Sequence, residues 1–112
     1  MRVSNNKARD YVNGFKEFQG SNMFGKWLDV GNGRTETNLL YAVYSYGSHF
    51  PMYVWDSTEK KWLGNKDKYS QSTTRHQALA KPYHVHRWVD TEGLKSMIRD
   101  GIVGYCINQA QT

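Results

Sequence analysis

The chain has 112 residues, which leaves room for one small hydrophobic core, and we expect a single domain over residues 1–112. Only 38% of the residues are hydrophobic, yet 14% are aromatic, and each buried ring removes roughly 150–250 Å² from water, which argues against a disordered chain. The lone cysteine, Cys106, excludes an internal disulfide and a cysteine-based zinc site, and it suits a reducing cytoplasm. The first residues lack the apolar stretch of a signal peptide, and no apolar run approaches the ~18 residues of a membrane span, so we expect an intracellular protein without membrane contact.

The net charge of +5 is unevenly distributed along the chain. The segment from Lys60 to Arg87 contains seven basic residues and one acid, Asp67, so it carries +6 and the remainder nets −1. A local positive field of this kind attracts polyanions or acidic protein surfaces. The alternative is that these cations are solvated and only keep a small protein soluble.

In the first third of the chain, Ser4 to Phe18 has the apolar spacing of an amphipathic helix, with Ser4 or Asn5 as its cap and Gly20 as its end. Gly14 lowers the helix propensity inside this segment. A short strand is predicted at Phe24 to Val30, before a turn-rich segment.

The middle of the chain predicts three strands. Leu39 to Tyr46 alternates with apolar or aromatic side chains on both faces, which predicts a central strand covered on both sides. Pro51 to Trp55 and Lys61 to Leu63 follow as a hairpin, in which Trp55 and Trp62 are expected to face each other as structural residues.

The last third predicts two helices and two strands. Ser72 or Thr73 caps a short helix that runs through Ala80 and is ended by Pro82. An edge strand is predicted at Tyr83 to Val89. A helix capped by Asp90 or Thr91 follows, with Leu94, Met97 and Ile98 on one face and Gly101 as its stop. The last predicted element is a strand at Ile102 to Ile107. The predicted fold is α+β: a mainly antiparallel sheet of about four or five strands, packed against an N-terminal, a middle and a C-terminal helix.

The stretch KYSQSTTRHQ (residues 68–77) places hydroxyls and a guanidinium at the start of the predicted middle helix. Unpaired N–H groups and the helix dipole converge at such a point and suit an anion such as phosphate. The candidate ligand-binding residues are Lys66, Lys68, Ser70, Thr73, Thr74, Arg75 and His76. The alternative is an ordinary helix cap with spare hydroxyls.

Aromatic residues alternate with the basic ones in the same part of the chain, at Trp62, Tyr69, Tyr83 and Trp88. Rings for bases and cations for phosphates are typical of surfaces that bind single-stranded nucleic acid. Most rings of so aromatic a small domain are nevertheless expected in its core. A possible partner-binding face comprises His49, Lys60, Lys61, Lys81 and Arg87.

The sequence favours binding over catalysis. His84 and His86 with an acid such as Asp90 have the chemistry of a zinc site, but no second ligand pair stands at metal-binding spacing. Ser70 or Thr74 with His76 would need an orienting acid to act as a nucleophile, and the spacing supplies none. We therefore expect no catalytic residues, no metal and no cofactor.

Four stretches carry a family likeness: FQGSNMFGKW (18–27), YAVYSYGSHFPMYVWD (41–56), WLGNKDKYSQSTTRHQ (62–77) and LKSMIRDGI (94–102). On these stretches the chain resembles a family of small proteins encoded by tailed bacteriophages. In that family a Tyr-Gly-x-His-Phe-Pro turn joins two strands, and a Lys-Tyr-Ser-x-(Ser/Thr)-Thr-x-(Arg/Lys)-His element follows. The matching positions are Tyr46, Gly47, His49, Phe50 and Pro51, then Lys68, Tyr69, Ser70, Thr73, Thr74, Arg75 and His76.

The resemblance implies a phage gene product in the host bacterial cytoplasm and no particular activity. Combined with the charge pattern, it gives a first hypothesis of a phage accessory or host-takeover protein that binds nucleic acid or a phosphate-bearing ligand, as a monomer or homodimer. An alternative is a protein inhibitor of a host or anti-phage defence enzyme, of the anti-restriction or anti-CRISPR type, which would meet an acidic host protein surface. An enzyme acting on nucleotides or nucleic acid is the third hypothesis.

Overall fold

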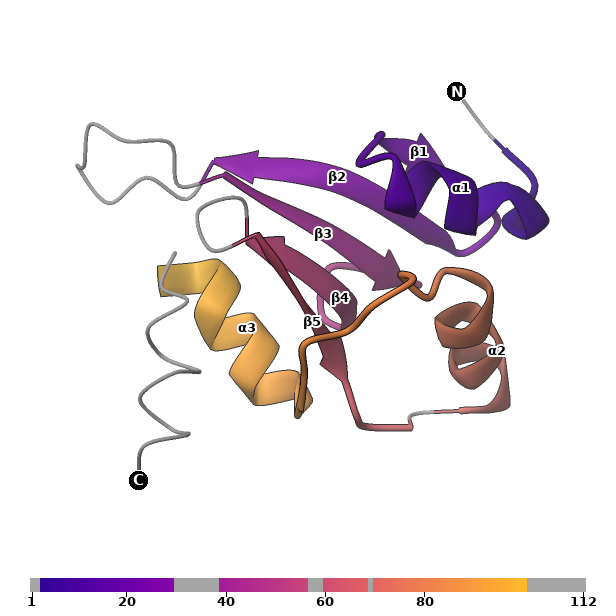
Figure 1. Ribbon diagram of the computed structural model, residues 1–112. Coiled ribbons are helices and arrows are strands. Elements are labelled where there is room, and N and C mark those ends of the chain that lie inside the picture. Colours follow the sequence, from indigo (N-terminus) through magenta and orange to yellow (C-terminus); the bar gives the residue numbers. More distant parts are fainter. Residues whose placement is uncertain (1–2, 30–38, 57–59, 69, 101–112) are drawn as a thin grey trace.

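The computed structural model describes residues 3–29, 39–56, 60–68 and 70–100. Within them the fold is α+β, a mainly antiparallel sheet with an N-terminal, a middle and a C-terminal helix, which confirms the predicted class. The described part has six strands. Figure 1 shows how the strands and the three helices are arranged. The elements in chain order are the 3₁₀ helix η1 (Asn5–Lys7), α1 (Ala8–Asn13), β1 (Phe18–Gln19), β2 (Met23–Asp29), β3 (Leu39–Ser45), β4 (Pro51–Asp56), β5 (Lys61–Asn65), α2 (Gln71–Leu79), β6 (Arg87–Val89) and α3 (Thr91–Asp100).

The strands lie side by side in the order in which they occur in the chain. Each strand is antiparallel to the preceding one except β6, which runs parallel to β5. Antiparallel neighbours need only a turn between them, whereas a parallel pair needs a longer crossover. Here the crossover contains α2 and an extended connection of residues 80–86, so the topology itself carries α2 to the end of the sheet.

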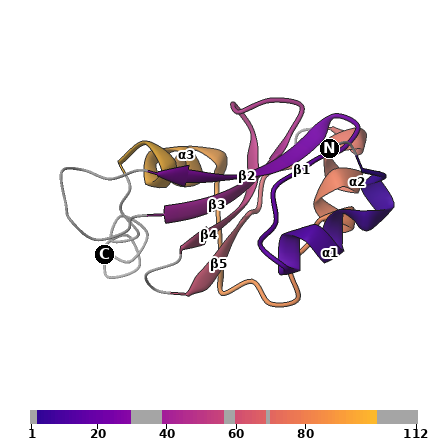
Figure 2. The same ribbon diagram turned by 90° about the horizontal axis from the view of Figure 1, so that it is seen from above.

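Strand β3 is buried on both faces, as its sequence predicts. Tyr41 and Val43 belong to a core on one face, which we call the α1 face, and Leu40 and Ala42 belong to a core on the opposite, α3 face. Side chains from α1 and from the connection of residues 80–86 cover the α1 face, and side chains from α3 cover the other. Figure 2 shows α3 on one side of the sheet and α1 with this connection on the other.

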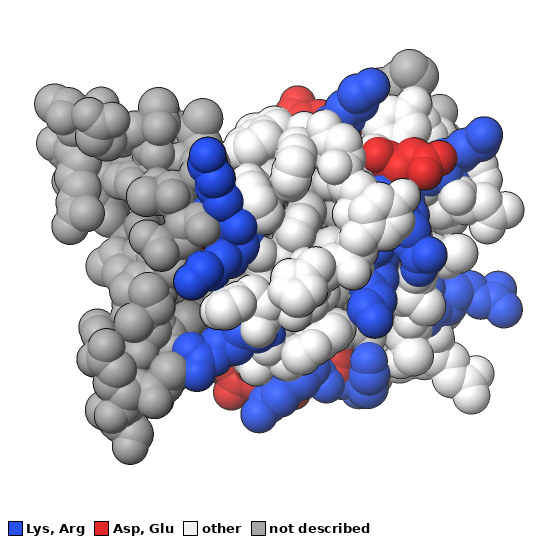
Figure 3. Space-filling model, viewed as in Figure 1, with Lys and Arg blue, Asp and Glu red and all other residues white. Residues whose placement is uncertain are grey.

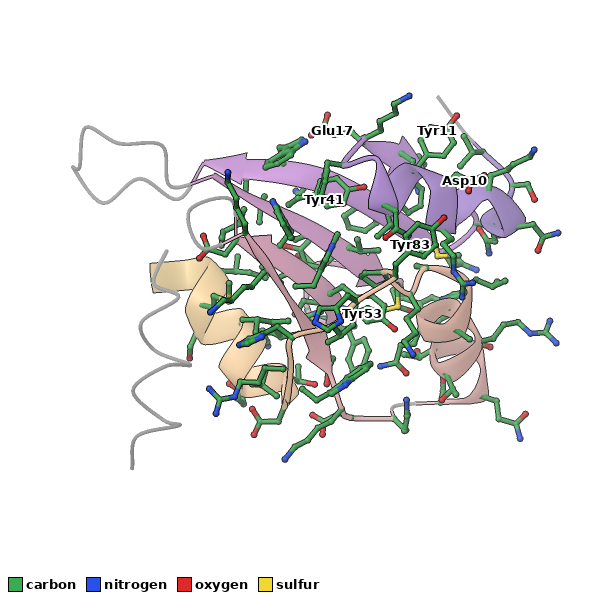
Figure 4. All side chains as sticks on the ribbon, in the orientation of Figure 1. Asp10, Tyr11, Glu17, Tyr41, Tyr53 and Tyr83 are labelled. Atoms are coloured by element: carbon green, nitrogen blue, oxygen red, sulfur yellow. The ribbon has the colours of Figure 1, made fainter. Side chains whose placement is uncertain are left out.

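Aromatic rings fill the α1 face. Trp55 and Trp62 are partners across β4 and β5 with ring centroids 5.7 Å apart, which confirms the predicted pair. Phe15 stacks on Trp62 at 5.8 Å and an interplanar angle of 12°. Tyr41 and Tyr53 lie between the sheet and the elements that cover it (Figure 4), and the Tyr53 hydroxyl donates to the Gln77 carbonyl at 2.7 Å. This bond attaches α2 to the sheet.

The first helix is shorter than predicted. It begins after Ser4, whose side chain accepts from the Asn6 N–H as expected of a cap, but α1 ends at Asn13 rather than at Phe18. Gly14 forms the C-cap, and Phe15 takes a left-handed φ of 56°, which a continuing helix does not allow. Phe18 is therefore free to enter the short strand β1, which the periodicity did not predict.

The predicted strand at Tyr83 to Val89 is also wrong in extent, because only Arg87–Val89 pairs in the sheet. The preceding residues cross the α1 face instead, where Val85 packs on the core and the His86 N–H donates to the Trp62 carbonyl at 2.8 Å. An alternating pattern does not distinguish a strand from an extended connection with one side on a core. The predicted strand at Ile102 to Ile107, like Gly101, lies outside the described residues.

Replacing Leu94 by alanine is expected to lower the free energy of unfolding by about 2–5 kcal/mol, because this fully buried side chain joins α3 to the core of the α3 face. Urea denaturation measures the change. The neighbouring Lys95→Ala substitution, on a half-exposed position of the same helix, is the matched control and should change stability little. Equal effects of the two substitutions would contradict this packing of α3.

Candidate functional site

Two segments that are distant in the sequence meet at the end of β3. One is the turn of residues 46–50 between β3 and β4, and the other is the first turn of α2. They enclose a pocket of about 350 Å³. Its lining residues are Ser45, Tyr46, His49, Phe50, Ser70 and Thr73.

The start of α2 forms one wall of the pocket. Ser70 has an extended backbone, and its Oγ accepts from the Thr73 N–H at 3.1 Å, so Ser70 is the N-cap. The prediction of Ser72 or Thr73 as the cap is therefore wrong. Thr73 is fully buried instead, with its hydroxyl 3.2 Å from Ser70 Oγ and 3.4 Å from Ser45 Oγ. The first N–H groups of a helix have no intrahelical acceptor, so the positive end of the helix dipole lies at this wall.

The connection from β5 to α2 is fixed by Gln77. The buried side-chain amide of Gln77 donates to the carbonyls of Asn65 and Asp67, at 3.1 Å each. The carboxylate of Asp67 in turn accepts from the Thr91 N–H at 2.9 Å and from the Thr91 hydroxyl at 2.8 Å, and these bonds lower its pKa. Ser70 stands at the α2 end of this connection, whose β5 end is held by bonds to α2 and α3.

A buried hydrogen bond joins the two walls. Ser45 Oγ lies 2.8 Å from His76 Nδ1, and the two residues are only 1% and 6% exposed. Burial lowers the pKa of His76, so the imidazole is neutral at physiological pH. The ring of His76 also lies 5.4 Å from that of Tyr46, which further ties the turn to α2.

Tyr46 places an aromatic ring at the rim of the pocket. Its backbone has a left-handed φ of 69°, which is uncommon for a bulky residue. The Tyr46 N–H donates to the Asn22 carbonyl at 2.7 Å, which stabilises this conformation. The residue stays 51% exposed, so part of its ring is open to a ligand.

The Ser45–His76 pair lacks other parts of a nucleophilic site. No carboxylate among the described residues hydrogen-bonds to His76. The N–H of Ser45 donates to the Phe50 carbonyl, and that of Tyr46 is also occupied, so neither is available to stabilise an oxyanion. The geometry therefore favours a positioning role for this pair.

The structure brings only some of the predicted ligand residues together. Ser70 and Thr73 line the pocket, and His76 supports it from behind. The Thr74 hydroxyl instead donates to the Ser70 carbonyl of its own helix at 2.9 Å. Arg75 is exposed on α2, and its guanidinium hydrogen-bonds to none of the described residues.

The predicted cations lie apart from one another. Lys66 and Lys68 are exposed beyond the end of β5, and Lys68 Nζ is 3.5 Å from Gln77 Oε1. Lys60 and Lys61 stand at the start of that five-residue strand, roughly 17 Å away along it. Of the remaining partner-face residues, His49 lines the pocket, Lys81 follows α2 and Arg87 lies in β6. The charged segment of the sequence is thus spread over several parts of the surface.

Three lining residues were missing from the predicted site: Ser45, Tyr46 and Phe50. Tyr46 and Phe50 were present only as members of the turn motif, and Ser45 only as part of a strand. These residues are identified by the spatial proximity of the 46–50 turn and the start of α2. The spacing of residues along the sequence does not reveal this proximity.

The described residues contain no group of three or more His, Cys, Asp or Glu side chains placed to hold a metal ion. No helix in the described ranges is both long and apolar enough to cross a membrane. Comparison of the chain with protein-family models, curated proteins and solved structures gives no match. The resemblance to phage proteins therefore stays a prediction.

Replacing Ser70 by alanine is expected to lower the free energy of unfolding by about 1 kcal/mol, because the Thr73 N–H loses its capping acceptor. Ser72→Ala is the matched control, since Ser72 is exposed and its hydroxyl bonds to no described residue. Thermal or urea unfolding of both variants distinguishes the observed cap from the one that the sequence predicts. A larger loss from Ser72→Ala than from Ser70→Ala would contradict the assignment.

Proposed function

We propose that the protein is a non-catalytic binding protein that holds a phosphate group, carried by a nucleotide or by nucleic acid, in the pocket between the 46–50 turn and α2. The observation that carries this proposal is the convergence of the Ser70 and Thr73 hydroxyls and the His49 imidazole on one pocket at a helix start. None of the described lining residues is acidic.

The pocket suits a small phosphorylated ligand in size and in chemistry. Its volume of about 350 Å³ lies within the range of roughly 300–1,000 Å³ that is usual for small-molecule sites. The Ser70 hydroxyl, the His49 imidazole and the helix dipole favour a negative group near the α2 wall. The neutral His76 imidazole hydrogen-bonds to the Ser45 hydroxyl. This bond holds the two walls of the pocket in position before a ligand binds.

Tyr46 supports a nucleotide as the carrier of the phosphate. Its half-exposed ring stands at the rim, beside the hydroxyls of the α2 wall. Stacking of a base on an aromatic ring contributes about 1–3 kcal/mol. In this arrangement the phosphate lies at α2 and the base lies on Tyr46.

The biological setting is part of the proposal. The two motifs that carry the phage resemblance, at residues 46–51 and 68–76, supply most of the pocket lining. We place the protein in the host bacterial cytoplasm, as a phage accessory protein that acts by binding.

Isothermal titration calorimetry with thymidine 5′-monophosphate, inorganic phosphate and unphosphorylated thymidine tests the proposal. We expect the monophosphate to bind most tightly, inorganic phosphate more weakly because it does not stack, and thymidine not to bind. Ser70→Ala and His49→Ala should each weaken binding of the monophosphate about tenfold to 100-fold, because each removes a hydrogen bond to a charged group.

Thr74→Ala is the matched control, since its hydroxyl is bonded to its own helix and lies outside the pocket lining. This variant should bind like the wild type. Thymidine binding as tightly as its monophosphate, or no binding by either phosphate probe, would refute the proposed function.

A further inference from the structure

A second surface lies on the α1 face, apart from the pocket. The extended connection between α2 and β6 crosses this face, with one exposed ring on it, at Tyr83, and another just after it in β6, at Trp88. Tyr83 is 77% exposed and Trp88 is 44% exposed, whereas Trp62 beneath them is only 6% exposed. His84 and His86, also exposed, lie between the two rings. We call Tyr83, His84, His86 and Trp88 the aromatic ridge.

The ridge is held in place by its backbone and by the core below it. The Tyr83 N–H donates to Asn13 Oδ1 at 2.9 Å, at the end of α1 (Figure 4 shows Tyr83 beside this helix). Val85 packs into the core, and the His86 N–H is bonded to the carbonyl of Trp62. The exposed rings are therefore fixed on an ordered backbone, which lowers the entropy lost when a ligand stacks on them.

The ring of Trp88 packs over a position of β5 that has no side chain. Its register partner is Gly64, where an added Cβ would lie only 2.7 Å from Trp88 Cζ3. The Trp88 ring also meets Tyr53 edge-on, with centroids 6.2 Å apart. One side of the indole thus packs on the protein, and its exposed part is available for stacking.

Cations flank the ridge. Residues 81–88 contain Lys81 and Arg87 and no acid. Lys66 lies two positions beyond Gly64, and its N–H donates to the Val89 carbonyl at 2.8 Å, which brings its backbone beside the end of β6. Figure 3 shows this face with an uncharged middle and with Lys and Arg side chains on both sides of it, among which lie some Asp and Glu side chains.

We infer that the aromatic ridge binds single-stranded nucleic acid, with bases stacked on Tyr83 and Trp88 and the phosphate backbone near the flanking cations. Fixed exposed rings bordered by Lys and Arg are what unpaired bases and their phosphates need. In a duplex the bases are stacked on each other and do not reach such rings. A protein partner fits less well, because two imidazoles separate the rings and the ridge offers no continuous apolar centre.

Fluorescence anisotropy with a labelled 12-nucleotide oligothymidine, and with a duplex of the same length, tests this inference. Saturating thymidine 5′-monophosphate is added throughout, so that any binding in the pocket is competed away. We expect the single strand to bind more tightly than the duplex, with an affinity that falls as salt rises. Tyr83→Ala should weaken single-strand binding about 5- to 150-fold, the loss of one stacked base.

Tyr83→Phe keeps the ring and should bind like the wild type, and Lys95→Ala on α3 controls for a general loss of positive charge. Trp88→Ala should weaken binding as Tyr83→Ala does, and Tyr83 is so exposed that its removal leaves the fold intact. Wild-type affinity in Tyr83→Ala, or equal binding of single strand and duplex, would overturn the inference. Neither result depends on whether the pocket binds a nucleotide.

Discussion

Strand β3 must be covered on both of its faces, and the rest of the structure follows from this constraint. Its aromatic and aliphatic side chains are removed from water on either side, and each buried side chain contributes roughly 1.5–3 kcal/mol. One layer of helices cannot satisfy both faces. The chain therefore places α3 on one side, and α1 together with the crossover connection on the other (Figure 2).

That crossover explains where the pocket lies. A parallel pair of β5 and β6 requires a long connection, and α2 is the helix within it. The Tyr53 hydroxyl and the Gln77 amide attach α2 to the sheet and to the end of β5. The start of α2 is thereby brought to the end of β3, where Ser45 and His76 close a buried hydrogen bond between residues 31 positions apart. The pocket is thus a consequence of the topology.

The features that the sequence analysis assigned to one basic segment lie on two separate surfaces, the pocket and the aromatic ridge. The pocket contains hydroxyls and an imidazole at a helix start, and the ridge contains exposed rings with cations beside them. Neither surface contains all of the predicted ligand and partner-face residues, in part because β5 separates Lys60 and Lys61 from Lys66 and Lys68.

Local sequence patterns correctly predicted the elements whose structure depends mainly on their own consecutive residues. The two-sided alternation of β3, the Trp55–Trp62 pair and the apolar face of α3 are all visible in a few consecutive residues. The end of α1 was missed because Phe15, rather than a glycine, takes the left-handed conformation.

Features that depend on tertiary contacts were not predictable. Ser70, Ser72 and Thr73 are equally good caps in sequence, and only the burial of Thr73 against Ser45 decides between them. The pocket needs the turn of residues 46–50 and α2 to meet, and no spacing in a single sequence reports that contact.

The central claim is that the pocket formed by the two motif segments binds phosphate. Amide chemical shifts of the ¹⁵N-labelled protein, recorded during titration with thymidine 5′-monophosphate, test it most directly because they locate the ligand. The account predicts that the largest shifts fall within residues 45–50 and 70–76. Shifts confined to the lysines at the two ends of β5, with the pocket residues unchanged, would contradict it.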